Sequence, residues 1–171
     1  MKKILAVTFV AALALSGCAK NNSGLNTNPG ANQALVEEQK ASAESGFGSK
    51  INLGKDYVVS FSTPVHFVPS PYASNFNAGF IANKFEVTLT NNSKSPLDTT
   101  SISFKAASGT NVCTDILDGD SGITGAPTSA LAAGATETFV MAVGCNAKVG
   151  DPLEIRAVFG AEVAALTGTI A

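Results

Sequence analysis

A one-for-one alternation of apolar and polar side chains restricts the fold of this 171-residue chain more than any other feature. The alternation is clearest between residues 80 and 90, where Phe85, Val87 and Leu89 are separated by single polar residues. Successive side chains of a β-strand point to opposite faces of a sheet, so a period of two buries one face and exposes the other. We therefore predict a half-buried strand over this segment.

Further short segments have a β-rich composition, and several of them repeat the alternation. They span residues 57–62, 65–68, 101–105, 137–143, 153–159 and 164–170. Turn-forming residues separate them and no strong helical pattern intervenes, which is typical of an antiparallel β-sandwich. We predict an all-β fold whose core includes Phe85, Val87, Leu89, Phe104, Phe139, Met141 and Ile155.

A polar turn follows the clearest strand, over residues 91–96 with the sequence Asn-Asn-Ser-Lys-Ser-Pro. Asparagine and serine side chains hydrogen-bond to nearby backbone, which favours turns. Asn91, Asn92 and Ser93 also match the N-glycosylation sequon, but we interpret them as turn residues.

The strand and turn from Lys84 to Asp98 together resemble the strand–turn motif of the DUF4352 family. The segment from Leu131 to Glu137 is similar to the Leu-x-Pro-Gly-Glu-Thr turn before that family's next strand, although alanines replace its proline and its acid. The resemblance runs from Tyr57 to the C-terminus. It implies an immunoglobulin-like antiparallel β-sandwich in an exported protein, and it carries over no functional residues.

The N-terminus predicts a leader peptide. Two lysines after Met1 precede an apolar run from Ile4 to Leu15, which is too short to span a bilayer and is typical of a secretory signal. The tetrapeptide Leu-Ser-Gly-Cys then ends at Cys18 and resembles the bacterial lipobox. We expect residues 1–17 to be removed and Cys18 to carry a fatty-acyl lipid that holds the chain on the extracytoplasmic face of the cell membrane. An ordinary cleaved signal with a chance cysteine is the alternative.

Residues 18–50 form the predicted linker. They are rich in Asn, Ser, Gly and Ala, and such segments bury too little apolar surface to offset the entropy of ordering. A weak helix over residues 33–44 is the alternative to a flexible, disordered tether. The folded domain is expected to occupy residues 51–171.

The composition disfavours a nucleic-acid partner. Charged residues make up 14% of the chain, and the net charge of −2 becomes −4 when Lys2 and Lys3 leave with the leader. No basic run is present to attract a phosphate backbone.

Cys113 and Cys145 are the remaining cysteines once Cys18 is lipidated. An even pair in an exported protein predicts a disulfide. Two free buried thiols, or a metal pair aided by His66, are the alternatives, but a metal site would need more ligands than one distant histidine supplies.

An acidic loop offers the main candidate for a metal site. Asp115, Asp118 and Asp120 could supply oxygen ligands for calcium, although their spacing is not that of an EF-hand and a solvated loop is the simpler interpretation. His66, within a predicted strand, is expected to be structural or merely exposed. No Gly-x-Ser-x-Gly motif accompanies the serines, so no catalytic residues and no cofactor are predicted.

Two classes of function follow from these features. The first is a non-catalytic binding or structural module at the cell envelope, with an envelope protein or a cell-wall polymer as partner. The alternative is a small-ligand or calcium-binding protein, or a metal-dependent enzyme, whose candidate ligands are the acidic loop and His66.

Overall fold

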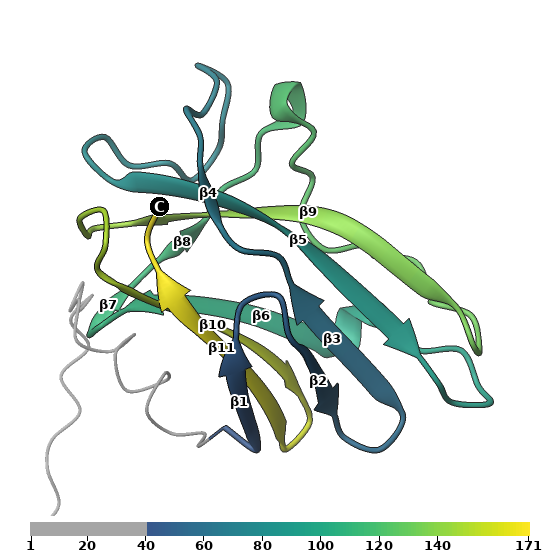
Figure 1. The fold of residues 1–171 in the computed structure, drawn as a ribbon. Helices are drawn as coiled ribbons and strands as arrows, with labels where there is room; N and C mark the ends of the chain where they lie inside the picture. Colours follow the sequence, from purple (N-terminus) through teal and green to yellow (C-terminus); the bar gives the residue numbers. More distant parts are fainter. Residues whose placement is uncertain (1–40) are drawn as a thin grey trace, which may run out of the picture.

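The computed structural model describes residues 41–171, which form two β-sheets packed face to face (Figure 1). The predicted leader, the predicted lipidation site Cys18 and most of the predicted linker lie outside the described residues. Sheet A contains, in spatial order, β1 (Ala43–Gly46), β11 (Glu162–Thr169), β10 (Pro152–Phe159), β6 (Ile102–Ser108) and β7 (Asn111–Val112). Sheet B contains β2 (Lys50–Leu53), β3 (Tyr57–Phe61), β5 (Ile81–Asn91), β9 (Thr136–Cys145) and β8 (Thr114–Asp115), and β4 (Val65–His66) also pairs with β5.

The connections follow the Greek-key order of an immunoglobulin domain. Strands β3, β5, β9 and β8 lie in one sheet and β6, β10 and β11 in the other, and the chain crosses between the sheets after β1, β5, β7 and β9. All pairings are antiparallel except that of β1 with β11. The fold is therefore the predicted immunoglobulin-like β-sandwich.

The core lies between the two sheets, as the alternation of apolar and polar residues predicts. Of the seven predicted core residues, five are buried: Phe85, Val87, Leu89, Met141 and Ile155. Phe104 and Phe139 are only partly buried, and their rings pack edge to face with centroids 5.8 Å apart. Phe104 also contacts the ring of Phe61 at 6.0 Å, so an aromatic row leads from the core to one side of the sandwich.

The domain begins earlier than the sequence suggested. Strand β1 lies within the range 18–50 assigned to the linker, and it pairs in parallel with β11 over four residues. The Phe47 ring, just after β1, lies against Gly168 of β11 so closely that a Cβ at Gly168 would clash with it. A start at residue 51 is therefore wrong, because pairing with a distant strand orders a short polar segment that lacks a clear strand pattern.

The turn at residues 91–96 is built around the fully buried side chain of Asn91. Its Oδ1 accepts from the Ser93 backbone at 2.9 Å, and its Nδ2 donates to the carbonyls of Ser95, Leu131 and Ala132 at 2.9–3.1 Å. The turn interpretation is confirmed, and the amide of the glycosylation sequon is fully engaged inside the domain.

The predicted disulfide between Cys113 and Cys145 is present, with Cα atoms 4.4 Å apart. Cys113 lies between β7 and β8, where the chain passes from sheet A to sheet B, and Cys145 ends β9. The bond therefore fixes this crossing to sheet B.

Candidate functional site

Two loops cover the outer face of sheet B at one end and form what we call the cap, residues 67–80 and 116–126. The two loops rise side by side above the sheet in Figure 1, and a backbone bridge joins Ser74 to Leu117. Below them three outward positions of β5 and β9 are small: Ala82, Ala142 and Gly144. These small residues let the cap lie close to the sheet, and a second apolar cluster fills the space with Phe67, Ala82, Ile116, Ile123 and Ala142.

Asp118 fastens the two cap loops together. Its buried carboxylate accepts from the Ser70 backbone at 2.8 Å, from the Ser70 hydroxyl at 2.8 Å and from the Ser121 hydroxyl at 2.9 Å. Hydrogen bonds from the Ser70 backbone, and from both hydroxyls, lower the pKa of Asp118 below its usual range. This aspartate therefore joins the two cap loops.

The acidic loop is not assembled as a metal site. Asp118 is committed to the serines, Asp115 lies on β8, and Asp120 lies on the 3₁₀ turn Gly119–Ser121. Within residues 41–171 no three His, Cys, Asp or Glu side chains are grouped closely enough to hold a metal ion, and His66 is exposed on β4. The geometry therefore gives the calcium alternative no ligand set.

A groove of about 460 Å³ opens between the sheets beside the cap. Its apolar lining comes mainly from β6, from β9 and from the residues just after β8: Ile102, Phe104, Ile116, Leu117, Met141 and Ala142. Polar side chains surround these residues: Asn75, Ser103, Asp115 and Thr124. Apolar walls with a few polar groups and a volume of roughly 300–1,000 Å³ are typical of ligand-binding sites.

The groove lies where both sheets are left open. Strand β7 pairs with β6 at Ala107 and Ser108, and β8 pairs with β9 at Val143 and Gly144. In the described part of the chain, no strand pairs with this edge of β6 before Ala107 or with this edge of β9 before Val143. The edge of β6 therefore flanks the groove with unpaired backbone, whereas on β9 the Ala142 carbonyl accepts from the Ile116 N–H at 2.9 Å.

Asp115 gives the groove a negative group. Its side chain reaches solvent, yet the surrounding protein raises its pKa by desolvation of the charged form. The salt bridge found in residues 41–171 joins Arg156 to Glu154 on β10, so the Asp115 carboxylate has no ion-pair partner in the described domain.

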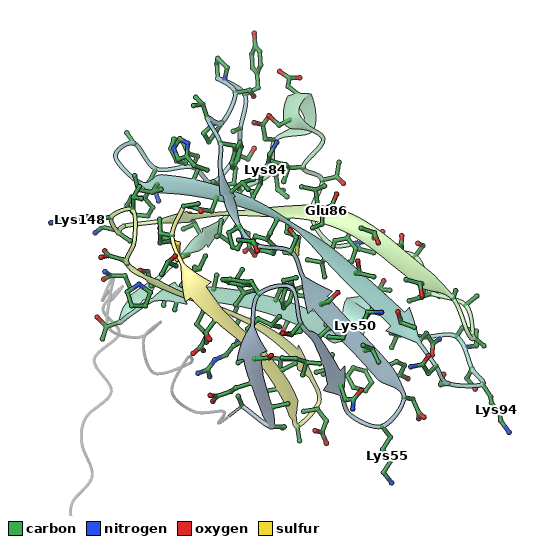
Figure 2. The ribbon with its side chains drawn as sticks, viewed as in Figure 1. Lys50, Lys55, Lys84, Glu86, Lys94 and Lys148 are labelled. Carbon is green, nitrogen blue, oxygen red and sulfur yellow. A yellow bond between two sulfur atoms is a disulfide. The ribbon has the colours of Figure 1, made fainter. Side chains whose placement is uncertain are left out.

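The lysines labelled in Figure 2 lie apart from one another. Lys94 and Lys148 project at opposite ends of the domain, Lys50 lies on β2, and Lys55 projects at the turn after β2. Lys84 lies on sheet B with its ammonium 5.9 Å from the Phe67 ring centroid. The labelled side chains therefore do not form one basic face.

The cap also displays large apolar side chains to solvent. Val68 is 81% exposed and Tyr72 is 85% exposed, both in the loop between β4 and β5. Exposed apolar groups on a fixed scaffold are typical of contact surfaces.

Sequence reasoning missed most of this site. Ser70 and Asp118 are 48 positions apart, and the groove unites β6, β9 and both cap loops, so no local pattern indicates either one. Asp115 is the one predicted site residue that lines the groove. No helix within residues 41–171 is long and apolar enough to cross a membrane.

No protein family profile and no curated protein matches the sequence, so membership of DUF4352 stays a prediction. Among solved structures, the fold is similar to that of ycdA from Bacillus subtilis subsp. subtilis strain 168, provisionally named a lipoprotein. The TM-score is 0.56 at 16% identity, over 70% of this chain and 38% of that one. An uncharacterised β-sandwich protein from Clostridium difficile 630 has a TM-score of 0.49 at 14% identity, over 77% of this chain and 96% of that one. A β-glucosidase from intestinal bacteria has a TM-score of 0.33 at 16% identity, over 66% of this chain and 16% of that one.

Proposed function

We propose that this protein is a lipoprotein held on the extracytoplasmic face of the cell membrane through Cys18, and that its domain binds an envelope partner without catalysing a reaction. The observation that carries the binding role is the groove beside the cap, which combines an apolar lining, polar side chains and the unpaired edge of β6. The partner would be an envelope protein or a cell-wall polymer.

The anchoring part of the proposal is supported by the lipobox-like leader and by the fold similarity to ycdA, which carries a lipoprotein name. Two acyl chains suffice for stable anchoring, because each buried CH₂ contributes about 0.8 kcal/mol. The DUF4352 resemblance agrees with an exported location.

Membrane fractionation tests the anchor. The wild-type chain should be recovered in the membrane fraction with lipid on Cys18, and Cys18→Ala should be released or left as uncut precursor. Unchanged membrane retention of Cys18→Ala would contradict the anchor.

Photo-crosslinking in intact cells tests the binding role. A photoreactive amino acid at Thr124, exposed beside the groove, should form a discrete adduct, and the same group at Lys55, on the exposed turn after β2, serves as the matched control. Adducts of equal yield at both positions, or none at Thr124, would contradict binding through the groove.

A further inference from the structure

We propose that the groove binds an extended peptide segment, which adds as a strand to the edge of β6 and places a lysine or arginine side chain beside Asp115. This inference rests on the proposed function and specifies the chemistry of the partner. It follows from the direction of the backbone groups of β6, the apolar lining of the groove and the position of one carboxylate.

The backbone of β6 presents donors and acceptors to the groove. Ser108 pairs with Asn111 across a two-residue turn, and the Cys113 N–H donates to the Ala106 carbonyl at 2.9 Å. Backbone groups alternate in direction along an antiparallel strand, so those of Phe104 point the same way as those of Ala106. Strand β7 has ended before this point, which leaves the Phe104 N–H and C=O facing the groove with no strand beside them in the described chain.

The unpaired part of the edge is short and bounded. At its start the Ile102 N–H already bonds to the Thr99 carbonyl, and at its far end β7 closes the edge. Natural sheets usually cover or twist unpaired edges, because such edges template pairing with other chains. An edge left open beside an apolar groove therefore suits strand addition, in which backbone bonds give affinity and pockets select side chains.

The groove accepts the side chains of such a strand. Ile102, Phe104 and Met141 belong to the sandwich core or pack against it, yet they line the groove from its two sides. An added strand would direct every second side chain toward these residues. The partner segment should therefore alternate apolar and polar residues.

Asp115 selects the charge of the partner. The carboxylate lines the groove, protein around it disfavours its charged form, and no ion-pair partner joins it in the described domain. A lysine or arginine would supply the missing charge, whereas an acidic segment would be repelled. A metal ion is a poorer occupant, since it would require several more oxygen ligands than one carboxylate.

Peptide binding to the membrane-extracted full chain tests the inference. The probe is a fluorescein-labelled nine-residue peptide in which valine and threonine alternate around a central lysine, and binding is measured by fluorescence anisotropy. Replacing the central lysine with glutamate should weaken binding roughly tenfold or more. Two further peptides are N-methylated, one at the backbone amides along one edge and the other at those along the opposite edge. One of these two peptides should lose binding. If glutamate binds as well as lysine, or if neither methylated peptide loses affinity, the inference is overturned.

Two protein variants locate the contact. Asp115→Asn should bind the lysine-centred peptide no better than a glutamine-centred one, and its unchanged affinity for the glutamine peptide would show that the groove is intact. Asp120→Asn, an exposed carboxylate of the same loop that does not line the groove, is the matched control and should bind as the wild type does. Equal lysine preference in Asp115→Asn and wild type would refute the role of Asp115.

Amide hydrogen exchange separates this inference from the broader proposal. Exchange at the Phe104 amide should slow in the peptide complex, and binding without that protection would place the peptide elsewhere. Protection of Phe104 by a soluble cell-wall glycan but not by the peptide would also overturn strand addition. If Thr124 crosslinks in cells while no peptide binds, the proposed function stands and the peptide inference fails.

Discussion

Replacing Asn91 with alanine tests whether one buried amide joins the turn after β5 to the segment before β9. The side chain makes four contacts: one accepted from the Ser93 N–H and three donated to carbonyls at 2.9–3.1 Å. A typical hydrogen bond contributes about 1 kcal/mol net. The sum would approach 4 kcal/mol, but two N–H groups share three acceptors, so the expected loss is about 3 kcal/mol.

The acceptors themselves should tolerate the change. The Leu131 carbonyl keeps its bond from the Leu97 N–H at 2.8 Å, the Ser95 carbonyl keeps one from the Ser93 hydroxyl at 2.7 Å, and the Ala132 carbonyl keeps one from the Ala135 N–H at 3.1 Å. No carbonyl is left bare, so the larger penalty for an unsatisfied buried group does not apply to them. The loss then comes from the bonds removed.

Urea and thermal unfolding, followed by far-ultraviolet circular dichroism, measure this loss. About 3 kcal/mol corresponds to a fall in Tm of roughly 10 °C for a domain of this size. Asn92→Ala is the matched control, because Asn92 is exposed and no side-chain hydrogen bond is found for it. Asn91→Asp should cost more than Asn91→Ala, since it keeps the acceptor for Ser93 but points a buried carboxylate at three carbonyls. A tolerated Asn91→Asp, or an Asn91→Ala within 1 kcal/mol of the control, would refute the reasoning.

Three further predictions concern other contacts. Removing the disulfide with Cys113→Ala/Cys145→Ala should cost roughly 4 kcal/mol from its separation of 32 residues, and quantitative alkylation of both thiols in the native, non-reduced protein would contradict the bond. Gly168→Ala should displace the Phe47 ring and loosen β1, which hydrogen exchange at Ser42 and Phe47 would detect. Gly119→Ala, which has no atom near its Cβ and no left-handed backbone, should leave their exchange unchanged. The cap should loosen in acid, because the pKa of Asp118 is lowered from 3.8. The charged carboxylate stabilises the cap fully above pH 3.8, and this stabilisation is lost as the pH falls through the lowered pKa. Amide protection at Ser74 and Leu117 reports this change, which should be absent in Asp118→Asn. The pKa of Asp115 is raised, so its contribution to stability changes with pH in the opposite direction.

The long strands were predictable because their burial follows a local pattern. Strand β5 spans Ile81–Asn91 and so differs from the predicted segment 80–90 by one residue at each end. Strand β10 begins one residue before its predicted segment. Each faces a continuous core on one side, so the period of two survives along its length. Phe139 has the same pattern but lies at the open side of the sandwich, and Phe139→Ala should therefore cost less than Phe85→Ala.

The short strands and the site depend on contacts that no local pattern contains. Strand β1 holds one small apolar residue and two small neutral ones, and it becomes a strand because Val163 and its neighbours supply backbone partners. Asp118 was expected to lie in a solvated loop, with calcium binding as the alternative, whereas its carboxylate is buried and accepts from three donors of Ser70 and Ser121. Residue propensities cannot distinguish a calcium ligand from an aspartate that accepts hydrogen bonds from serines, because both occur in turning loops.

The position of β1 relates the predicted anchor to the groove. β1 and β7 form opposite edges of sheet A, with β11, β10 and β6 between them. Adjacent strands lie about 4.8 Å apart, so β6 runs roughly 14 Å from β1 across the sheet. The described domain thus begins at one edge of sheet A, and β6 lies toward the other edge (Figure 1). The groove opens beside β6. We therefore propose that a partner segment pairs with β6 while the predicted lipid on Cys18 stays in the membrane.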